Sequence, residues 1–220
     1  MASVELMLRA LNCPVYCSVI PAWSIFNLRE YLTSFIDKHP NIKLITTRHS
    51  DVASALYALL SGKLDFVIMR EFLPSQHNLE VTFLSQDNMI VVLPKSHPLA
   101  GKGNINLSEI KDVTLMARPL LQEILLSFCK NLGYCALKLV EYDDRREAVL
   151  ARIAFGNGNA IFYESDLAPY NLSDVSISRL DGLPPTPLVI VSAKDRRITD
   201  YQRKFKDYLV DALSKHKMKI

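Results

Sequence analysis

Two arginines of this sequence are placed to bind a charged ligand. Arg70 and Arg118 each follow an apolar run of strand length. A guanidinium offers two parallel N–H donors, which match the two oxygens of a carboxylate. The two arginines therefore favour an anionic ligand, on the condition that both strand ends face one cleft. A second interpretation stays open, because Glu71 and Glu123 are near enough in the sequence to pair with them.

Two turns before predicted helices add hydroxyl and imidazole groups. The turn after the first predicted strand contains Ile20, Pro21, Ala22, Trp23 and Ser24, and the turn before the second helix contains His49, Ser50 and Asp51. The first N–H groups of a helix have no partner within the helix and favour an anion. Together with the arginines, the two turns predict the lining of a small-molecule cleft.

No arrangement typical of catalysis or of metal binding is present in the sequence. The segment 61–63 (Ser-Gly-Lys) lacks the first glycine of a phosphate-binding loop and ends a predicted helix. The glycines of 155–159 follow a helix instead of a strand, which indicates a helix stop and not a dinucleotide site. None of the five histidines lies in a nucleophile-elbow or zinc-protease pattern. We therefore expect no enzyme activity, no metal and no cofactor.

The four cysteines predict buried thiols. Cys13 and Cys17 lie four residues apart in an extended segment, which separates them by about 13 Å, beyond the reach of a disulfide. Cys129 and Cys135 flank the end of a predicted helix, so a redox pair there stays open. No spacing of cysteine and histidine matches a zinc site.

Composition and charge exclude several classes of protein. The 220 residues, of which 49% are hydrophobic, supply a sizeable core. The net charge of +3 is too small and too evenly spread for a nucleic-acid-binding surface. The longest apolar runs are far shorter than the ~20 residues that cross a bilayer. The N-terminus has no secretory pattern, so we expect a cytoplasmic protein without membrane contact.

Apolar runs of strand length alternate with amphipathic segments of helix length. The predicted strands are 15–19, 42–46, 64–69, 80–84, 89–93, 113–116, 137–141, 160–163, 175–178 and 188–192. The predicted helices are 24–39, one that Ser50 or Asp51 opens and Gly62 closes, a single turn at 107–111, 119–132, one from Asp143 or Asp144 to Gly156, and one that opens with a capping box at 199–202. Helices between strands predict an α/β fold with mostly parallel sheets.

We expect this pattern to form two lobes that exchange the chain twice. Lobe I takes approximately 12–70 and 164–220, and lobe II takes approximately 75–163. The crossings are expected near 70–75 and 163–168.

Five segments resemble the effector-binding domain of LysR-type transcriptional regulators. They are Phe35–Leu44, Leu59–Ile68, Val91–Ala100, Leu107–Val113 and Ala154–Ile161. They follow the order and spacing of that family over about residues 12–213. The resemblance implies a fold like that of type II periplasmic binding proteins, in which two lobes hold a small inducer between them.

The resemblance also implies the partners of the chain. Family members form dimers in which the first long helix of one subunit packs against the sheet edge of the other, and a tetramer is expected for the full-length protein. A winged helix-turn-helix upstream of this domain binds DNA in the family. That module is missing from the sequence, so we expect contact with operator DNA only through an absent N-terminal domain.

The family's ligand site corresponds to the two turns and to the strand end at Ala117 and Arg118. Members often hold the ligand's carboxylate with a hydroxyl after the first strand, where Ser24 is the first hydroxyl here. Some members use a hydroxyl at the position of Ala117, whereas Ser50 matches the donor of the second helix. These departures predict a larger or more apolar ligand that packs on Trp23, or a site altered beyond ordinary use.

We therefore expect an effector-sensing and dimerisation domain of a LysR-type regulator, which binds a small anionic metabolite. A solute-binding receptor of the same fold is the alternative. A small α/β enzyme is a weaker alternative, because no catalytic cluster is found.

Overall fold

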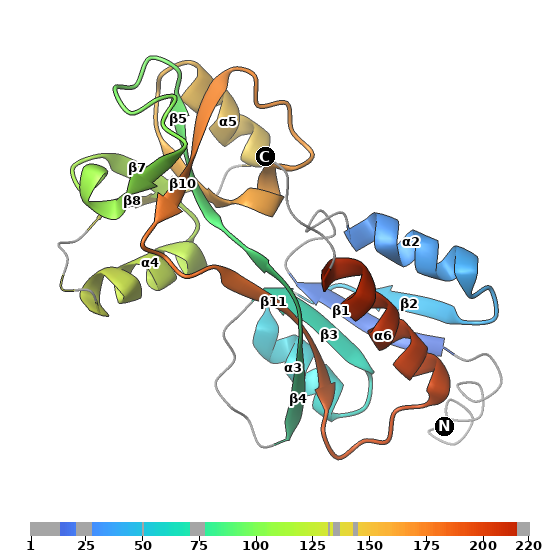
Figure 1. Cartoon of the computed structure of the whole chain (residues 1–220). Coiled ribbons are helices and arrows are strands. Elements are labelled where there is room, and N and C mark those ends of the chain that lie inside the picture. The colour runs from blue at the N-terminus through green and yellow to red at the C-terminus, as the bar shows by residue number, and fades with distance from the viewer. Residues whose placement is uncertain are drawn as a thin grey trace. The chain divides into compact units, whose positions relative to one another are not determined.

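The computed structural model describes residues 14–20, 28–49, 51–70, 78–131, 133, 137–142 and 145–214. The chain forms two units (Figure 1). The first unit contains the described residues of Met1–Gln86 and Thr186–Ile220, and the second contains those of Asp87–Pro185. A five-stranded sheet forms the centre of the first unit and a six-stranded sheet that of the second.

The sheet of the first unit has the strand order β2-β1-β3-β11-β4. The strands are β1 (Pro14–Ile20), β2 (Lys43–Thr47), β3 (Phe66–Arg70), β4 (Leu79–Asp87) and β11 (Thr186–Ala193). The strand β1 pairs in parallel with β2 and β3, and β11 pairs antiparallel with β3. The carboxyl ends of β1, β2 and β3 therefore meet at one edge of the sheet.

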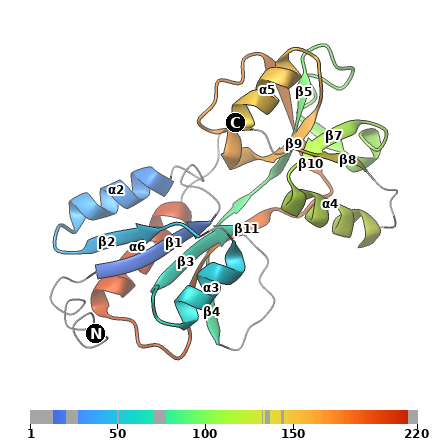
Figure 2. The same cartoon turned by 180° about the vertical axis from the view of Figure 1, so that it is seen from behind.

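Three helices cover the two faces of this sheet. The helices α2 (Leu28–Lys38) and α6 (Asp200–Ser214) lie on one face, and α3 (Val52–Leu60) lies on the other (Figures 1 and 2). Side chains alternate along β1, so that Val15, Cys17 and Val19 belong to the core under α2 and α6, while Tyr16 packs on the α3 side. Each face of the sheet thus has its own apolar layer.

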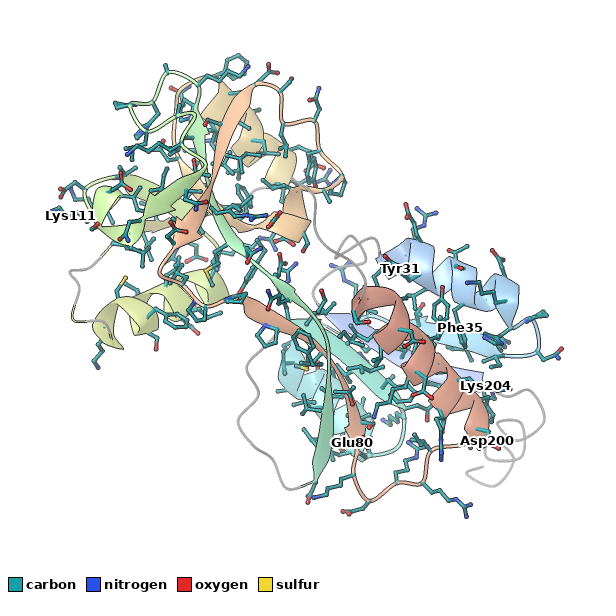
Figure 3. All side chains as sticks on the ribbon, in the orientation of Figure 1. Tyr31, Phe35, Glu80, Lys111, Asp200 and Lys204 are labelled. Carbon is teal, nitrogen blue, oxygen red and sulfur yellow. The ribbon has the colours of Figure 1, made fainter. Side chains whose placement is uncertain are left out.

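Aromatic side chains join the two helices of the first layer. Phe35 of α2 lies beside α6 (Figure 3), and its ring centroid is 5.1 Å from that of Phe205 and 5.3 Å from that of Tyr208. The edge-on geometry with Phe205 is one that aromatic pairs prefer. The helix α6 begins with the capping box that the sequence predicts, because Thr199 and Gln202 exchange hydrogen bonds of 2.8 and 3.4 Å.

The sheet of the second unit has the strand order β6-β10-β5-β9-β7-β8. The strands are β5 (Met89–Pro94), β6 (Asn104–Asn106), β7 (Thr114–Ala117), β8 (Lys138–Glu141), β9 (Ala160–Tyr163) and β10 (Val175–Asp181). The strand β7 pairs in parallel with β8 and β9, whereas β5 pairs antiparallel with β9 and β10. The α/β fold is confirmed, and its sheets are mixed.

Helices cover both faces of the second sheet as well. Alternate residues of β5 divide between two cores, one under α4 (Pro119–Asn131) and one under α5 (Arg146–Ala154). Short 3₁₀ turns follow β6 and β9, and they are η2 (Leu107–Glu109) and η3 (Glu164–Leu167). Within the described ranges, no helix is long and apolar enough to span a membrane.

The turn from α5 to β9 has the form that the sequence predicts, a helix stop followed by a tight turn. Gly156 has a φ of 77° and Gly158 a φ of 156°. A Cβ at position 158 would lie 2.7 Å from Cε of Met116 on β7. The backbone conformation favours glycine at this position, whereas the methyl group of Met116 ends a flexible side chain and can move aside.

The positions at which the chain passes between the units differ from those predicted. The division falls between Gln86 and Asp87 and between Pro185 and Thr186, and not near 70–75 and 163–168. The strand β4 belongs to the first sheet and β10 to the second. The physical reason is that an apolar, alternating strand carries no sequence signal for the sheet in which it pairs.

Candidate functional site

The carboxyl ends of the parallel strands in the first unit carry a small polar group. Ser18 on β1 is fully buried, and its Oγ is 2.9 Å from Nδ1 of His49, which follows β2. Thr47, the last residue of β2, is the register partner of Ser18, so both side chains face the α3 side. The Oγ1 atom of Thr47 is buried and has no hydrogen-bond partner in the part of the chain that the structure describes. A hydroxyl or amide of a ligand would complete this group.

The first turn of α3, next to this group, carries a negative charge. Asp51 caps the helix, and its carboxylate accepts a hydrogen bond of 2.7 Å from the backbone N–H of Ser54. The carboxylate thereby takes up one of the N–H groups expected to bind an anion, and it would repel one. This half of the predicted site suits neutral polar groups better than a carboxylate.

The remaining residues predicted in this unit are only partly described. Ile20 ends β1 and is the register partner of Met69 on the neighbouring strand. Arg70 ends β3, is 8% exposed and is the register partner of Leu188. The residues Pro21, Ala22, Trp23, Ser24 and Ser50 lie outside the described residues, as does Glu71. The structure thus places Ile20 and Arg70 on adjacent strands at one edge.

In the second unit the predicted residues lie at the end of β7. Ala117 is fully buried, and its carbonyl accepts a hydrogen bond of 2.8 Å from Nε2 of Gln122. Arg118 is exposed, and its guanidinium carbon lies 5.9 Å from the ring centroid of Tyr142, which follows β8. In the described part of the chain Arg118 forms no ion pair, so the alternative pairing with Glu123 is not seen. Its guanidinium remains available to a ligand.

A second arginine stands beside this pair. Nη2 of Arg146, the first residue of α5, is 3.2 Å from Oδ2 of Asp166, and the two side chains are 15% and 10% exposed. The positive charge of Arg146 lowers the pKa of Tyr170, against a larger effect of burial. The Nε atom of Arg146 is buried and has no hydrogen-bond partner among the described residues.

The N-terminus of α5 breaks the usual charge preference of helices. Arg145 occupies the N-cap position without a side-chain cap, and Arg146 follows it directly. A helix N-terminus carries about half a positive charge, so acidic residues are preferred there. Two cations at such an end are a local conflict, and conflicts of this kind mark functional positions. Glu147 in the same first turn offsets one of these charges.

The two tyrosines of this cluster are held in the neutral form. Burial raises the pKa of Tyr142, although the nearby guanidiniums of Arg118 and Arg146 work in the opposite direction. Burial also raises the pKa of Tyr170, and the carboxylate of Glu147 adds to the effect. Both phenols are therefore hydrogen-bond donors at neutral pH.

Sequence reasoning missed four members of this cluster: Tyr142, Arg146, Asp166 and Tyr170. A signal for Arg146 was present, because two arginines in succession open a helix directly after a strand. No local signal exists for Asp166, since it reaches Arg146 only through the fold. Among the described residues, no group of three or more His, Cys, Asp or Glu side chains could hold a metal ion.

The chain forms two α/β units and passes between them twice. Each unit has polar groups at the carboxyl ends of parallel strands. This architecture is that of ligand-binding proteins with the fold of type II periplasmic binding proteins. The family model described as "LysR substrate binding domain" matches residues 19–214, and the chain belongs to this family.

The relatives agree with this assignment. The chain is 25% identical over 190 residues to the HTH-type transcriptional regulator TtuA of Agrobacterium vitis. The matched region covers 83% of this chain and 60% of TtuA. The effector-binding domain of BenM with benzoate is similar in fold, with a TM-score of 0.79, 18% identity and coverage of 91% and 92% of the two chains. That of QuiR with shikimate gives a TM-score of 0.73, 19% identity and coverage of 93% and 99%.

Proposed function

We propose that this chain is the effector-sensing domain of a LysR-type transcriptional regulator and that its effector is a small anionic metabolite. The observation that carries the proposal is the pair of guanidiniums, Arg118 and Arg146, beside Tyr142 at the carboxyl ends of β7 and β8. Two structures of similar fold hold carboxylates, benzoate and shikimate, which supports an anion as the ligand.

We assign effector contacts within each unit. In the second unit we assign contacts to Arg118, which binds the anionic group, and to Ala117. In the first unit we assign contacts to Ile20, Ala22, Trp23, Ser24, His49, Ser50 and Arg70. An effector that binds one arrangement of the two units ten times better than the other shifts their equilibrium by about 1.4 kcal/mol.

The regulator acts as a homodimer, and as a tetramer in its full-length form. The helix α2 of one subunit packs against the edge strand β8 of the other, because both carry exposed apolar side chains. Ile36 on α2 is 42% exposed and Val140 on β8 is 49% exposed. The chain spans 60% of the length of TtuA, and an upstream helix-turn-helix supplies the contact with operator DNA. Such a regulator works in the cytoplasm, without a catalytic step.

A thermal-shift screen against organic acids tests this function. A ligand at 100 times its dissociation constant stabilises the protein by about 2.7 kcal/mol. This raises the melting temperature by several degrees, at roughly 2–4 °C per kcal/mol for a chain of this size. We expect Arg118→Ala to weaken binding of the best ligand at least tenfold in calorimetry, while the exposed Arg203→Ala leaves it unchanged. Equal affinities of the wild type and Arg118→Ala would contradict the assignment.

A further inference from the structure

We infer that Ser18 is a positioning residue, which fixes the ring of His49 so that its Nε2–H group donates a hydrogen bond to an oxygen of the effector. The inference rests on the proposed function, in which His49 contacts the effector. It names the chemistry of one ligand group, an oxygen acceptor such as a hydroxyl or a carbonyl. The hydrogen bond between Ser18 and His49, within the first unit, carries it.

The sheet holds Ser18 in place. Ser18 lies on β1 between its register partners, Thr47 on β2 and Val67 on β3, and its side chain is fully buried. A residue of an inner strand is fixed, because its backbone pairs with a neighbouring strand on each side. His49 follows the end of β2 by two residues and is partly exposed. The hydroxyl of Ser18 is therefore the fixed member of the pair, and the imidazole is the group that it orients.

The direction of the hydrogen bond follows from the burial of Ser18. A neutral imidazole carries one proton, at Nδ1 or at Nε2. Oγ of Ser18 is 2.9 Å from Nδ1. If Nδ1 held the proton, the hydroxyl hydrogen of Ser18 would have no acceptor among the residues that the structure describes. A buried donor without an acceptor is unfavourable, so Ser18 donates to Nδ1 and the ring proton lies on Nε2.

This orientation makes Nε2 of His49 a donor for a ligand. In the described ranges no residue accepts a hydrogen bond from Nε2. The charged residues on either side in the sequence, Arg48 and Asp51, are exposed and opposite in sign, so together they favour a neutral group. A hydroxyl or carbonyl oxygen accepts from Nε2–H, whereas an ammonium group has no lone pair with which to accept.

Related acids that differ in one group test the inference. The first set of probes is lactate, alanine and propionate, and the second is 3-hydroxybenzoate, 3-(aminomethyl)benzoate and benzoate. In each set the first acid carries a hydroxyl, the second an ammonium group and the third neither. Titration calorimetry of the wild type is expected to give at least fivefold tighter binding of the hydroxy acid in every set that binds.

Two substitutions of buried serines form a matched comparison. Ser18→Ala removes the hydroxyl that holds Nδ1, and we expect the preference for the hydroxy acid to fall at least threefold. Ser192→Ala removes a buried hydroxyl from β11 of the same sheet and leaves the preference unchanged. His49→Ala abolishes the preference, and because His49 is partly exposed, this variant folds whether or not Ser18→Ala does.

Nitrogen-15 NMR of the imidazole gives a readout that needs no ligand. In mildly alkaline solution the signals of His49 in the wild type are expected to show a single tautomer, with the proton on Nε2. In Ser18→Ala they are expected to move toward a mixture of both tautomers, whereas Ser192→Ala leaves them in place. A purely structural role of Ser18 would not change the tautomer of His49.

The outcomes separate this inference from the proposed function. A proton on Nδ1 in the wild type, or an equal preference in the wild type and Ser18→Ala, overturns the inference and leaves the effector-sensing function standing. Failure of every probe to bind, with no other organic acid stabilising the protein, overturns the function and the inference together.

Discussion

The carboxylate of Asp87 accepts two hydrogen bonds from Ser165, at 3.2 Å from its backbone N–H and at 2.6 Å from its hydroxyl. Asp87 is fully buried at the end of β4, and Ser165 lies in η3. Next to them, Nδ2 of Asn88 donates to Oε2 of Glu164 at 2.9 Å. These bonds attach the start of the second unit to the turn after β9.

Removal of the Asp87 carboxylate is expected to destabilise the second unit. In Asp87→Ala the backbone N–H and the hydroxyl of Ser165 lose a buried acceptor. A buried group left without its partner costs about 1–3 kcal/mol, and a charged acceptor lies at the upper end. We expect a loss of about 2–4 kcal/mol in urea denaturation, whereas Asp181→Ala, at an exposed position, changes stability by less than about 0.5 kcal/mol. Equal stabilities of the two variants would contradict this account.

Alanine substitutions at Gly158 and Gly156 measure how much the close contact with Met116 costs in stability. Both glycines have positive φ, but only a Cβ at position 158 meets another atom, Cε of Met116 at 2.7 Å. We expect Gly158→Ala to lose at most about 1 kcal/mol more than Gly156→Ala, because Cε ends a flexible side chain that can move aside. Thermal unfolding of both variants gives the difference. In a double-mutant cycle Gly158→Ala should cost less in the Met116→Ala background than in the wild type, and equal costs in both backgrounds would assign the effect to the backbone alone.

The stability of the protein in alkaline solution depends on Tyr142. Burial raises the pKa of this phenol above its ordinary value of 10.0. The folded state therefore holds the proton more tightly than the unfolded state, so stability is present below pH 10 and is lost as the pH rises through the folded value. In Tyr142→Phe the melting temperature should fall less steeply between pH 9 and 11. Parallel curves for the variant and the wild type would show that Tyr142 does not contribute.

The described cysteines are expected to be unreactive in the folded protein. Cys17 and Cys129 are buried, and burial raises the pKa of the Cys17 thiol far above its ordinary value. The thiolate is the reactive form, so little of it exists at pH 8. In the variant Cys13→Ser, Cys135→Ser we expect no rapid labelling by a thiol reagent, and two thiols after addition of urea. Fast labelling without urea would contradict the burial of one or both.

The proposed dimer is tested by a charge on its apolar edge. Ile36→Glu places a carboxylate on the outer side of α2 and is expected to convert the dimer to a monomer in sedimentation. Leu60→Glu is the matched control, since Leu60 is 50% exposed on α3, outside the proposed interface. A monomeric wild type, or dissociation by both variants alike, would overturn this interface.

Local signals predict most of the secondary structure. The capping box at Thr199 and Gln202 and the turn at Gly158 are sequence patterns that the structure confirms, because both depend on neighbouring residues. The inner face of α3 has no such local signal. Leu60 is half exposed, whereas the smaller Ala55 and Ala58 are buried. A helix without charges gives no signal for its outer side.

Only those residues of the candidate site that have a local sequence signal could be predicted. Arg118 follows a strand and can be found from the sequence, as can the turn at His49. The partner of His49 is Ser18, which lies in the middle of a predicted strand and reads as part of an apolar run. Asp166 meets Arg146 only because β9 and β8 flank β7. Contacts of this kind follow from strand order, which local patterns do not encode.

The position of β11 between β3 and β4 has a consequence for synthesis on the ribosome. The neighbour of β4 in the sheet is β11, which begins at Thr186, after the whole of the second unit. The nascent chain therefore holds β4 unpaired until Thr186–Ala193 has left the ribosome, whereas Asp87–Pro185 is continuous and can fold as soon as it emerges. Folding of that segment shortens the loop that β4 and β11 must close. The first unit, which contains the N-terminal part of the chain, therefore completes its folding after the second unit.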